Sequence, residues 1–141
     1  MFSGCSNITS FNALKNWNVS KGKNLSSMFN GCSSLLDSKG FENWDVSNAN
    51  NLASMYNSCS TLKEIESLIN WNVSNCNNFS IMFKECSSLL NLKPLQNWNF
   101  QMVINLVWYG NYEAIFGQCD RTTVTKAIRK WNIPKEQIVL I

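Results

Sequence analysis

The sequence contains no histidine, and only 15% of its 141 residues are charged. The missing imidazole excludes histidine-based catalysis, histidine metal ligation and a histidine pH switch between about pH 5 and 8. No apolar run approaches the ~18 residues of a spanning helix, so we expect no membrane insertion by this chain. The N-terminal residues MFSGCSN also have neither the basic nor the apolar region of a secretory signal.

Small uncharged polar side chains take the place of charge, because the chain contains 22 Asn and 18 Ser. Hydrophobic residues nevertheless make up 45% and aromatic residues 12% of the sequence, which argues against intrinsic disorder. The length is that of one ordinary domain.

A repeat of 27 residues organises the sequence. Trp17, Trp44, Trp71 and Trp98 follow one another at this interval, and Trp131 falls 33 residues later, so the last unit contains a six-residue insertion. We call a set of positions related by this interval a column. The other clear columns are Cys5, Cys32, Cys59, Cys86 and Cys119; Met1, Met28, Met55 and Met82; Phe2, Phe29, Tyr56, Phe83 and Phe116; and Leu14, Phe41, Leu68, Leu95 and Ile128.

The pattern within a unit predicts its secondary structure. Apolar residues spaced i, i+3, i+4 and i+7 predict a short helix, with Leu25, Met28, Phe29 and Cys32 on one face and Asn24 as its N-cap. The alternation of Trp44, Asp45 and Val46 predicts a very short, half-buried strand.

A single unit cannot bury its own apolar side chains, so the units are expected to stack. The predicted fold class is a repeat solenoid, with a short helix and one or two short strands per 27-residue unit. We predict one domain, in which residues 1–118 form the array and residues 119–141 a divergent basic C-terminal cap. A tryptophan in every unit at a fixed phase is typical of a core column, and a carbohydrate-stacking surface is the alternative.

The recurring segments W-[ND]-V-S, N-[LF]-[SA]-x-M-[FY] and C-S-[ST]-L resemble the BspA-like leucine-rich-repeat proteins, in the branch with roughly 26-residue repeats that is common in mycoplasma lipoproteins and other bacterial surface proteins. The resemblance covers about residues 1–106 closely, and residues 115–119 and 131–133 more loosely. It implies a right-handed leucine-rich-repeat-like solenoid on the cell surface or outside the cell. The implied function is non-catalytic, namely adhesion or binding of a protein or cell-surface ligand.

The alternative function is an intracellular or virion-associated scaffold, located in the cytoplasm or in a virion. Free cysteines fit this alternative, because reduced cysteines persist in the cytosol. Five of the six cysteines share one column, so we predict a row of buried, unpaired thiols. Cys76 lies off that column, and we expect it to be partly exposed.

No catalytic residue, metal site or cofactor is predicted. The sequence contains no C-x-x-C pair for zinc, no histidine to activate a thiol, and no repeated inward column of carboxylates. The net charge of +3 comes entirely from residues 119–141, with five basic and two acidic groups. A nucleic-acid-binding array would carry basic residues on every unit, so no nucleic acid partner is expected. This basic end is predicted to be a solvated cap, with contact to an acidic partner as the alternative.

The insertion lies within residues 107–112 and is the one segment outside the repeat. Insertions in repeat arrays map to loops that are often on a binding face, and aromatic residues anchor many interfaces. Trp108, Tyr109 and Tyr112 are therefore the candidate binding residues. In the alternative interpretation these rings pack under the C-terminal cap.

Overall fold

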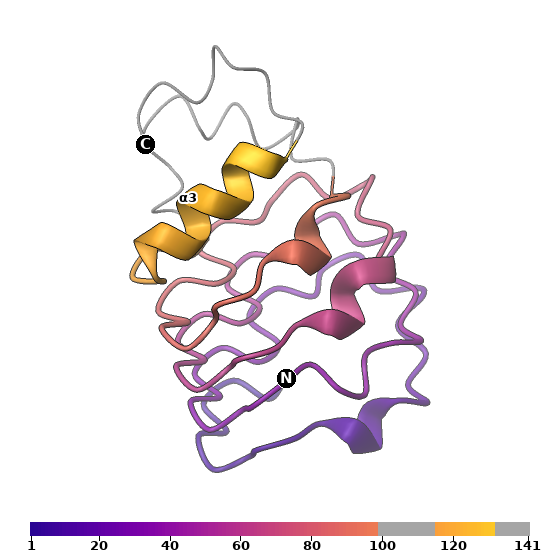
Figure 1. Cartoon of the computed structure of the whole chain (residues 1–141). Helices are drawn as coiled ribbons and strands as arrows, with labels where there is room; N and C mark the ends of the chain where they lie inside the picture. The colour runs from indigo at the N-terminus through magenta and orange to yellow at the C-terminus, as the bar shows by residue number, and fades with distance from the viewer. Residues whose placement is uncertain (99–114, 132–141) are drawn as a thin grey trace.

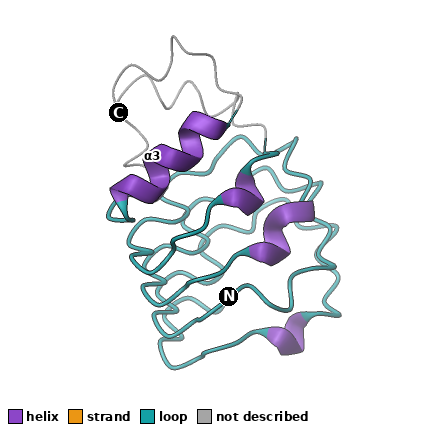
Figure 2. Cartoon of the chain, viewed as in Figure 1, coloured by secondary structure: helices purple, strands orange, loops and turns teal. Residues whose placement is uncertain are grey.

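A computed structural model describes residues 1–98 and 115–131 of the chain. Turns and irregular backbone make up most of this part (Figures 1 and 2). Its helical elements are three 3-10 turns and one α-helix, namely η1 (Asn12–Leu14), η2 (Glu66–Asn70), η3 (Lys93–Leu95) and α3 (Arg121–Lys130). Among the described residues, β-structure is limited to three isolated parallel bridges, Asn24 to Asn51, Asn51 to Asn78 and Asp37 to Glu64. None of the described helices has the length and apolar character needed to cross a membrane.

Successive 27-residue units lie side by side in register (Figure 1). The Phe29 amide donates to the Met55 carbonyl at 3.0 Å, and the Tyr56 amide donates to the Met82 carbonyl at 2.9 Å. Alternate amides of one unit therefore bond to the next unit, as neighbouring extended segments do. This contact places residues of one column directly next to each other.

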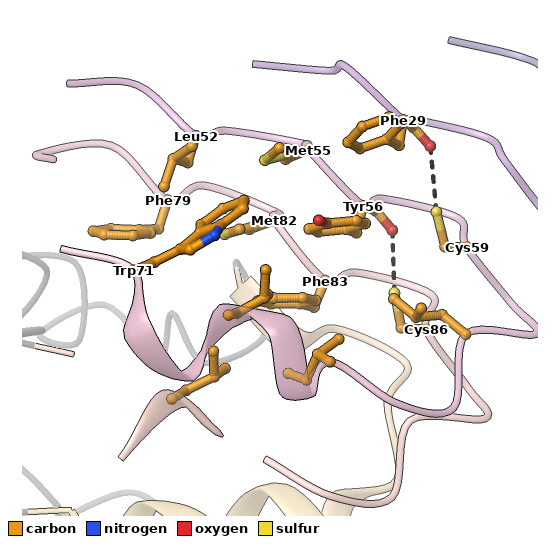
Figure 3. Close-up of a cluster of buried hydrophobic side chains, with 14 of the residues drawn as sticks. Phe29, Leu52, Met55, Tyr56, Cys59, Trp71, Phe79, Met82, Phe83 and Cys86 are labelled. Atoms are coloured by element: carbon orange, nitrogen blue, oxygen red, sulfur yellow. Dashed lines mark hydrogen bonds between the residues drawn. The ribbon is translucent and has the colours of Figure 1, made fainter. Parts of the chain in front are cut away.

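Aromatic rings of adjacent units stack to form a large buried cluster (Figure 3). The Tyr56 ring centroid lies 5.6 Å from that of Phe83, with the planes 7° apart, and Phe83 stacks in the same way on Phe116 at 5.7 Å. The Phe83–Phe116 pair crosses the insertion, so the predicted register of the last unit is confirmed.

Three of the four regularly spaced tryptophans form the predicted buried column. Trp71 stacks on Trp44 at 6.4 Å and on Trp98 at 6.3 Å, and all three side chains are at most 6% exposed. The prediction is wrong for Trp17, which is 40% exposed. Its ring leans on Phe2, at 5.7 Å and 39°, and no described unit covers its other side.

The predicted helix from Leu25 to Cys32 is absent, and this part of the unit is a series of turns. Ser27 and Gly31 adopt left-handed backbone angles, with φ of 55° and 73°, which an α-helix does not contain. The Asn24 side chain accepts from the Ser26 amide at 3.0 Å, so it closes a turn and is no N-cap. The apolar spacing is confirmed as a pattern of burial, but the amides bond between units.

The predicted strand at Trp44, Asp45 and Val46 is also absent. Trp44 and Val46 are buried and Asp45 is exposed, as the alternation predicted. However, Asp45 accepts from the Ser47 amide at 3.0 Å, and this turn takes the place of a strand.

The α-helix α3 packs its apolar face on the last units. Val124 and Ile128 are its buried residues, and the Asp120 side chain caps its N-terminus by accepting from the Thr123 amide at 2.7 Å. The structure thus contains a helix in the segment predicted to be a cap. That residues 119–141 form a divergent capping unit of the same domain stays a prediction.

Candidate functional site

The cysteine column forms a row between units, which we call the cysteine row (Cys5, Cys32, Cys59, Cys86 and Cys119). The Cys59 thiol donates to the Phe29 carbonyl at 3.2 Å, and the Cys86 thiol donates to the Tyr56 carbonyl at 3.1 Å (Figure 3). Cys32 and Cys119 make the same bond, to the carbonyls of Phe2 and Phe83. All six cysteines are free thiols.

Burial makes four thiols of the row, those of Cys32, Cys59, Cys86 and Cys119, poor nucleophiles. Loss of hydration raises the pKa of Cys32 to about 11, and the neighbouring Cys5 adds to the shift. Burial, followed by the Cys32 thiol, raises the pKa of Cys59 to about 12, and burial raises that of Cys119 to about 11. Because the thiolate is the reactive form, these sulfurs stabilise the core and are unsuited to catalysis near neutral pH.

The prediction of a partly exposed Cys76 is wrong, since this residue is 2% exposed. It belongs to a column with Gly22 and Ala49, in which Ala49 is also buried. The small size of all three residues was the sequence signal for an inward position. Burial raises the pKa of this thiol as well.

The three candidate binding residues Trp108, Tyr109 and Tyr112 lie outside the described residues. Their role as a binding loop or as part of the cap therefore stays a prediction. The described part of the chain offers a different candidate site.

An open cavity of about 230 Å³ lies beside η2, and we call it the acidic cavity. It is lined by Asp37, Ser38, Lys39, Glu42, Glu64, Glu66, Ser67 and Asn70. Four acidic residues and one lysine contribute to this lining, and the Lys39 ammonium lies 3.4 Å from the Asp37 carboxylate. The charged residues of the lining are thus mostly acidic, while the cavity surface itself is formed mainly by carbon atoms.

A hydrogen-bond network fixes the Glu42 carboxylate at this cavity. One of its oxygens accepts from the Ser67 hydroxyl at 3.1 Å, and the other accepts from the Gly40 amide at 2.9 Å. The Ser67 amide in turn donates to the Ser38 hydroxyl at 3.3 Å. Both serines are buried, at 2% and 7% exposure, so the wall of the cavity is held in place by bonds from two adjacent units.

The cavity interrupts a core column that the sequence analysis did not single out. Ser38 occupies the position of Phe11, Ile65 and Leu92, and those three are buried apolar residues. A serine in an otherwise apolar column was the available signal. The carboxylates lie at outward positions in neighbouring columns, so a search for repeated inward carboxylates did not find them.

Gly40 is required by the close packing of two units at this wall. A Cβ atom added there would lie 2.5 Å from the Phe11 carbonyl oxygen, and its φ of 100° is in the left-handed region. Any larger residue would push the first and second units apart and would shift the amide that binds Glu42.

Basic side chains on α3 make a second charged surface. Arg121, Lys126, Arg129 and Lys130 are exposed, and the last two lie in the final turn of the helix, where positive charge is favourable. Hydrogen bonds from Thr123 hold the pKa of Asp120 below its usual value. In residues 1–98 and 115–131, no group of three or more acidic or thiol side chains converges to hold a metal ion.

The described chain is a tandem-repeat protein in which the repeated side chains form the core. It belongs to the family described as "Mycoplasma protein of unknown function, DUF285", which matches residues 1–131. The match includes the insertion and α3, so the family's sequence pattern runs through most of the last unit. No curated protein and no solved structure matches the chain.

Proposed function

We propose that the chain is a non-catalytic binding module built as a right-handed, leucine-rich-repeat-like solenoid. The observation that supports this proposal is the use of the repeated side chains. Most tryptophans, phenylalanines and cysteines of successive units pack on one another and are buried in the described part of the chain. The surface of the described residues includes many uncharged polar side chains, the acidic cavity and the basic face of α3, which suit recognition better than chemistry.

We further propose a role in surface adhesion or protein–protein interaction, on the cell surface or outside the cell. This rests on the resemblance of the repeat to BspA-like surface proteins and is compatible with membership of the DUF285 family. An intracellular or virion-associated scaffold is the second candidate, and the six free thiols favour it.

Two places on the chain are candidates for the contact. The predicted one is the aromatic insertion with Trp108, Tyr109 and Tyr112. The other is the acidic cavity, where the fixed Glu42 carboxylate and its neighbours present acceptors to a basic partner.

The experiment measures binding of the fluorescently labelled chain to intact cultured cells. Saturable binding that the unlabelled chain displaces would support adhesion, while binding confined to the cytosolic fraction of lysed cells would support the scaffold. Two variants locate the contact. In the first, Trp108, Tyr109 and Tyr112 are replaced together by Ser, and the second is Glu42→Gln, an isosteric and neutral change. Each counts only if its melting curve matches that of the parent, and absence of saturable binding to either preparation contradicts the proposal.

A further inference from the structure

The contacts between units have a direction. The indole N–H of three buried tryptophans donates to a carbonyl of the preceding unit, Trp44 to Leu14, Trp71 to Phe41 and Trp98 to Leu68, at 3.1, 3.1 and 3.3 Å. The thiols of the cysteine row point the same way and donate to the preceding unit. These units therefore present side-chain donors toward the preceding unit, and their backbone carbonyls accept from the amides of that unit.

The first unit presents the same groups with nothing opposite them in the described chain. The Trp17 indole N–H and the Cys5 thiol meet no acceptor there, and Trp17 is 40% exposed. The carbonyls of Met1 and Ser3 receive no backbone hydrogen bond from residues 1–98 or 115–131, although their column partners in the second unit accept from the Phe2 and Gly4 amides. This surface of residues 1–22, which we call the first-unit face, is thus one half of the contact that joins all the other units.

We propose that the first-unit face binds a polypeptide segment carrying the repeat pattern of this chain, which stacks on it as a further unit. The chemistry of the occupant follows from the groups that it must satisfy. It has to supply two carbonyl acceptors that lie 12 residues apart within one unit, like those of Tyr56 and Leu68. It must also supply amides for the carbonyls of Met1 and Ser3, and apolar cover for Phe2 and Trp17.

Residues 55–81 of the chain already meet these requirements toward the next unit. The Tyr56 carbonyl accepts the Cys86 thiol, and the Leu68 carbonyl accepts the Trp98 indole. Placed on the first-unit face, the same two carbonyls would accept from Cys5 and Trp17. A flat aromatic ligand would cover the rings but would leave the backbone groups unpaired. The inference rests on the contacts between units alone and does not depend on the partner proposed above.

The experiment uses the isotope-labelled 141-residue chain and an unlabelled synthetic peptide of residues 55–81. We expect a saturable shift of the Trp17 indole N–H resonance and at least tenfold slower exchange of its proton, with the Trp71 resonance unchanged. The matched control is the same peptide with Ser at Tyr56, Leu68 and Trp71, which should give no shift. Trp17→Phe keeps a ring but removes the donor, and it should weaken binding about five- to tenfold, the effect of one hydrogen bond.

A free peptide loses conformational freedom when it binds, which weakens its binding. In a second experiment, a copy of residues 55–81 is therefore fused directly ahead of Met1, where it continues the 27-residue register. Protection of the Trp17 indole in the joined chain supports the inference. It is overturned if this proton exchanges as fast in the joined chain as in the 141-residue chain. It is equally overturned if the free peptide shifts another tryptophan and leaves Trp17 unchanged.

Discussion

Tyr56 carries a buried hydroxyl group that the core does not use. The residue is 0% exposed, and its ring lies 5.6 Å from both Phe29 and Phe83. Its hydroxyl oxygen is buried and makes no hydrogen bond. Burial raises the pKa of Tyr56 well above the ordinary value of 10.0. The described residues at the other positions of the column are all phenylalanines, so Tyr56→Phe should raise the free energy of unfolding.

The magnitude follows from two opposing effects. An unsatisfied buried polar group costs about 1–3 kcal/mol. Removing one oxygen atom leaves a small void, which costs on the order of 0.5–1 kcal/mol, less than for a methylene group. The net expected stabilisation is about 1 kcal/mol, or a rise of roughly 3–4 °C in Tm for a domain of this size.

Urea unfolding followed by tryptophan fluorescence gives the free energy of unfolding for the parent and the variant. The matched control is Phe83→Tyr, which adds a hydroxyl in the next unit of the same column and should destabilise by about 1–3 kcal/mol. If Tyr56→Phe instead lowered the free energy of unfolding by 1 kcal/mol or more, the hydroxyl would have a partner and our reasoning would be refuted.

Three further predictions concern the stack. Trp71→Ala should lower the free energy of unfolding by about 3–5 kcal/mol, since it leaves a large cavity in a buried column. Trp17→Ala should lower it by less than about 1 kcal/mol, because Trp17 is partly exposed. Equal losses for the two variants in urea titrations would contradict this prediction. Ile81 has a left-handed φ of 50°, which is costly for a β-branched residue. Ile81→Asn should therefore stabilise the fold by about 1 kcal/mol. A lower Tm of the variant in thermal melts would mean that the packing of the isoleucine side chain outweighs the backbone strain. The cysteine row predicts loss of stability in alkali. Burial raises the folded pKa above the unfolded value of 9.0, to about 11 for Cys32 and Cys119 and to about 12 for Cys59. Their contribution is therefore fully present below about pH 9 and lost as the pH rises through the folded values. Urea titrations between pH 7 and 11 check this, and a flat profile would count against buried thiols.

The sequence predicted which residues are inside better than it predicted the backbone that places them there. The 27-residue period requires residues such as Trp71 and Phe83 to contact their column neighbours, because a single unit cannot bury these rings. It does not specify the path of the chain within a unit. The spacing of Leu25, Met28 and Cys32 fits a helix, yet left-handed residues such as Ser27 turn the amides toward the next unit, and serine gives no strong signal for that conformation.

The candidate site was harder to predict for a related reason. The columns of the repeat predict features that recur in every unit. The acidic cavity does not recur, because it exists where Ser38 interrupts an apolar column. Its lining combines outward residues of two units, Glu42 from one and Glu64 from the next, whose proximity follows from the register. The register alone places Glu42 and Glu64 in adjacent units. The close approach of Gly40 to the Phe11 carbonyl depends on backbone distances, which cannot be predicted from the sequence pattern.

The direction of the bonds between units also determines how the chain responds to tension. These bonds lie along the line in which the units succeed one another, so a pull on the two ends loads them in series and not in parallel. Units then detach singly from an end, because each is held only by its neighbours. Each detached unit of 27 residues releases roughly 90 Å of extended chain. Such a chain lengthens in steps at low force, and the part that is still stacked keeps its surface intact while the end is drawn out.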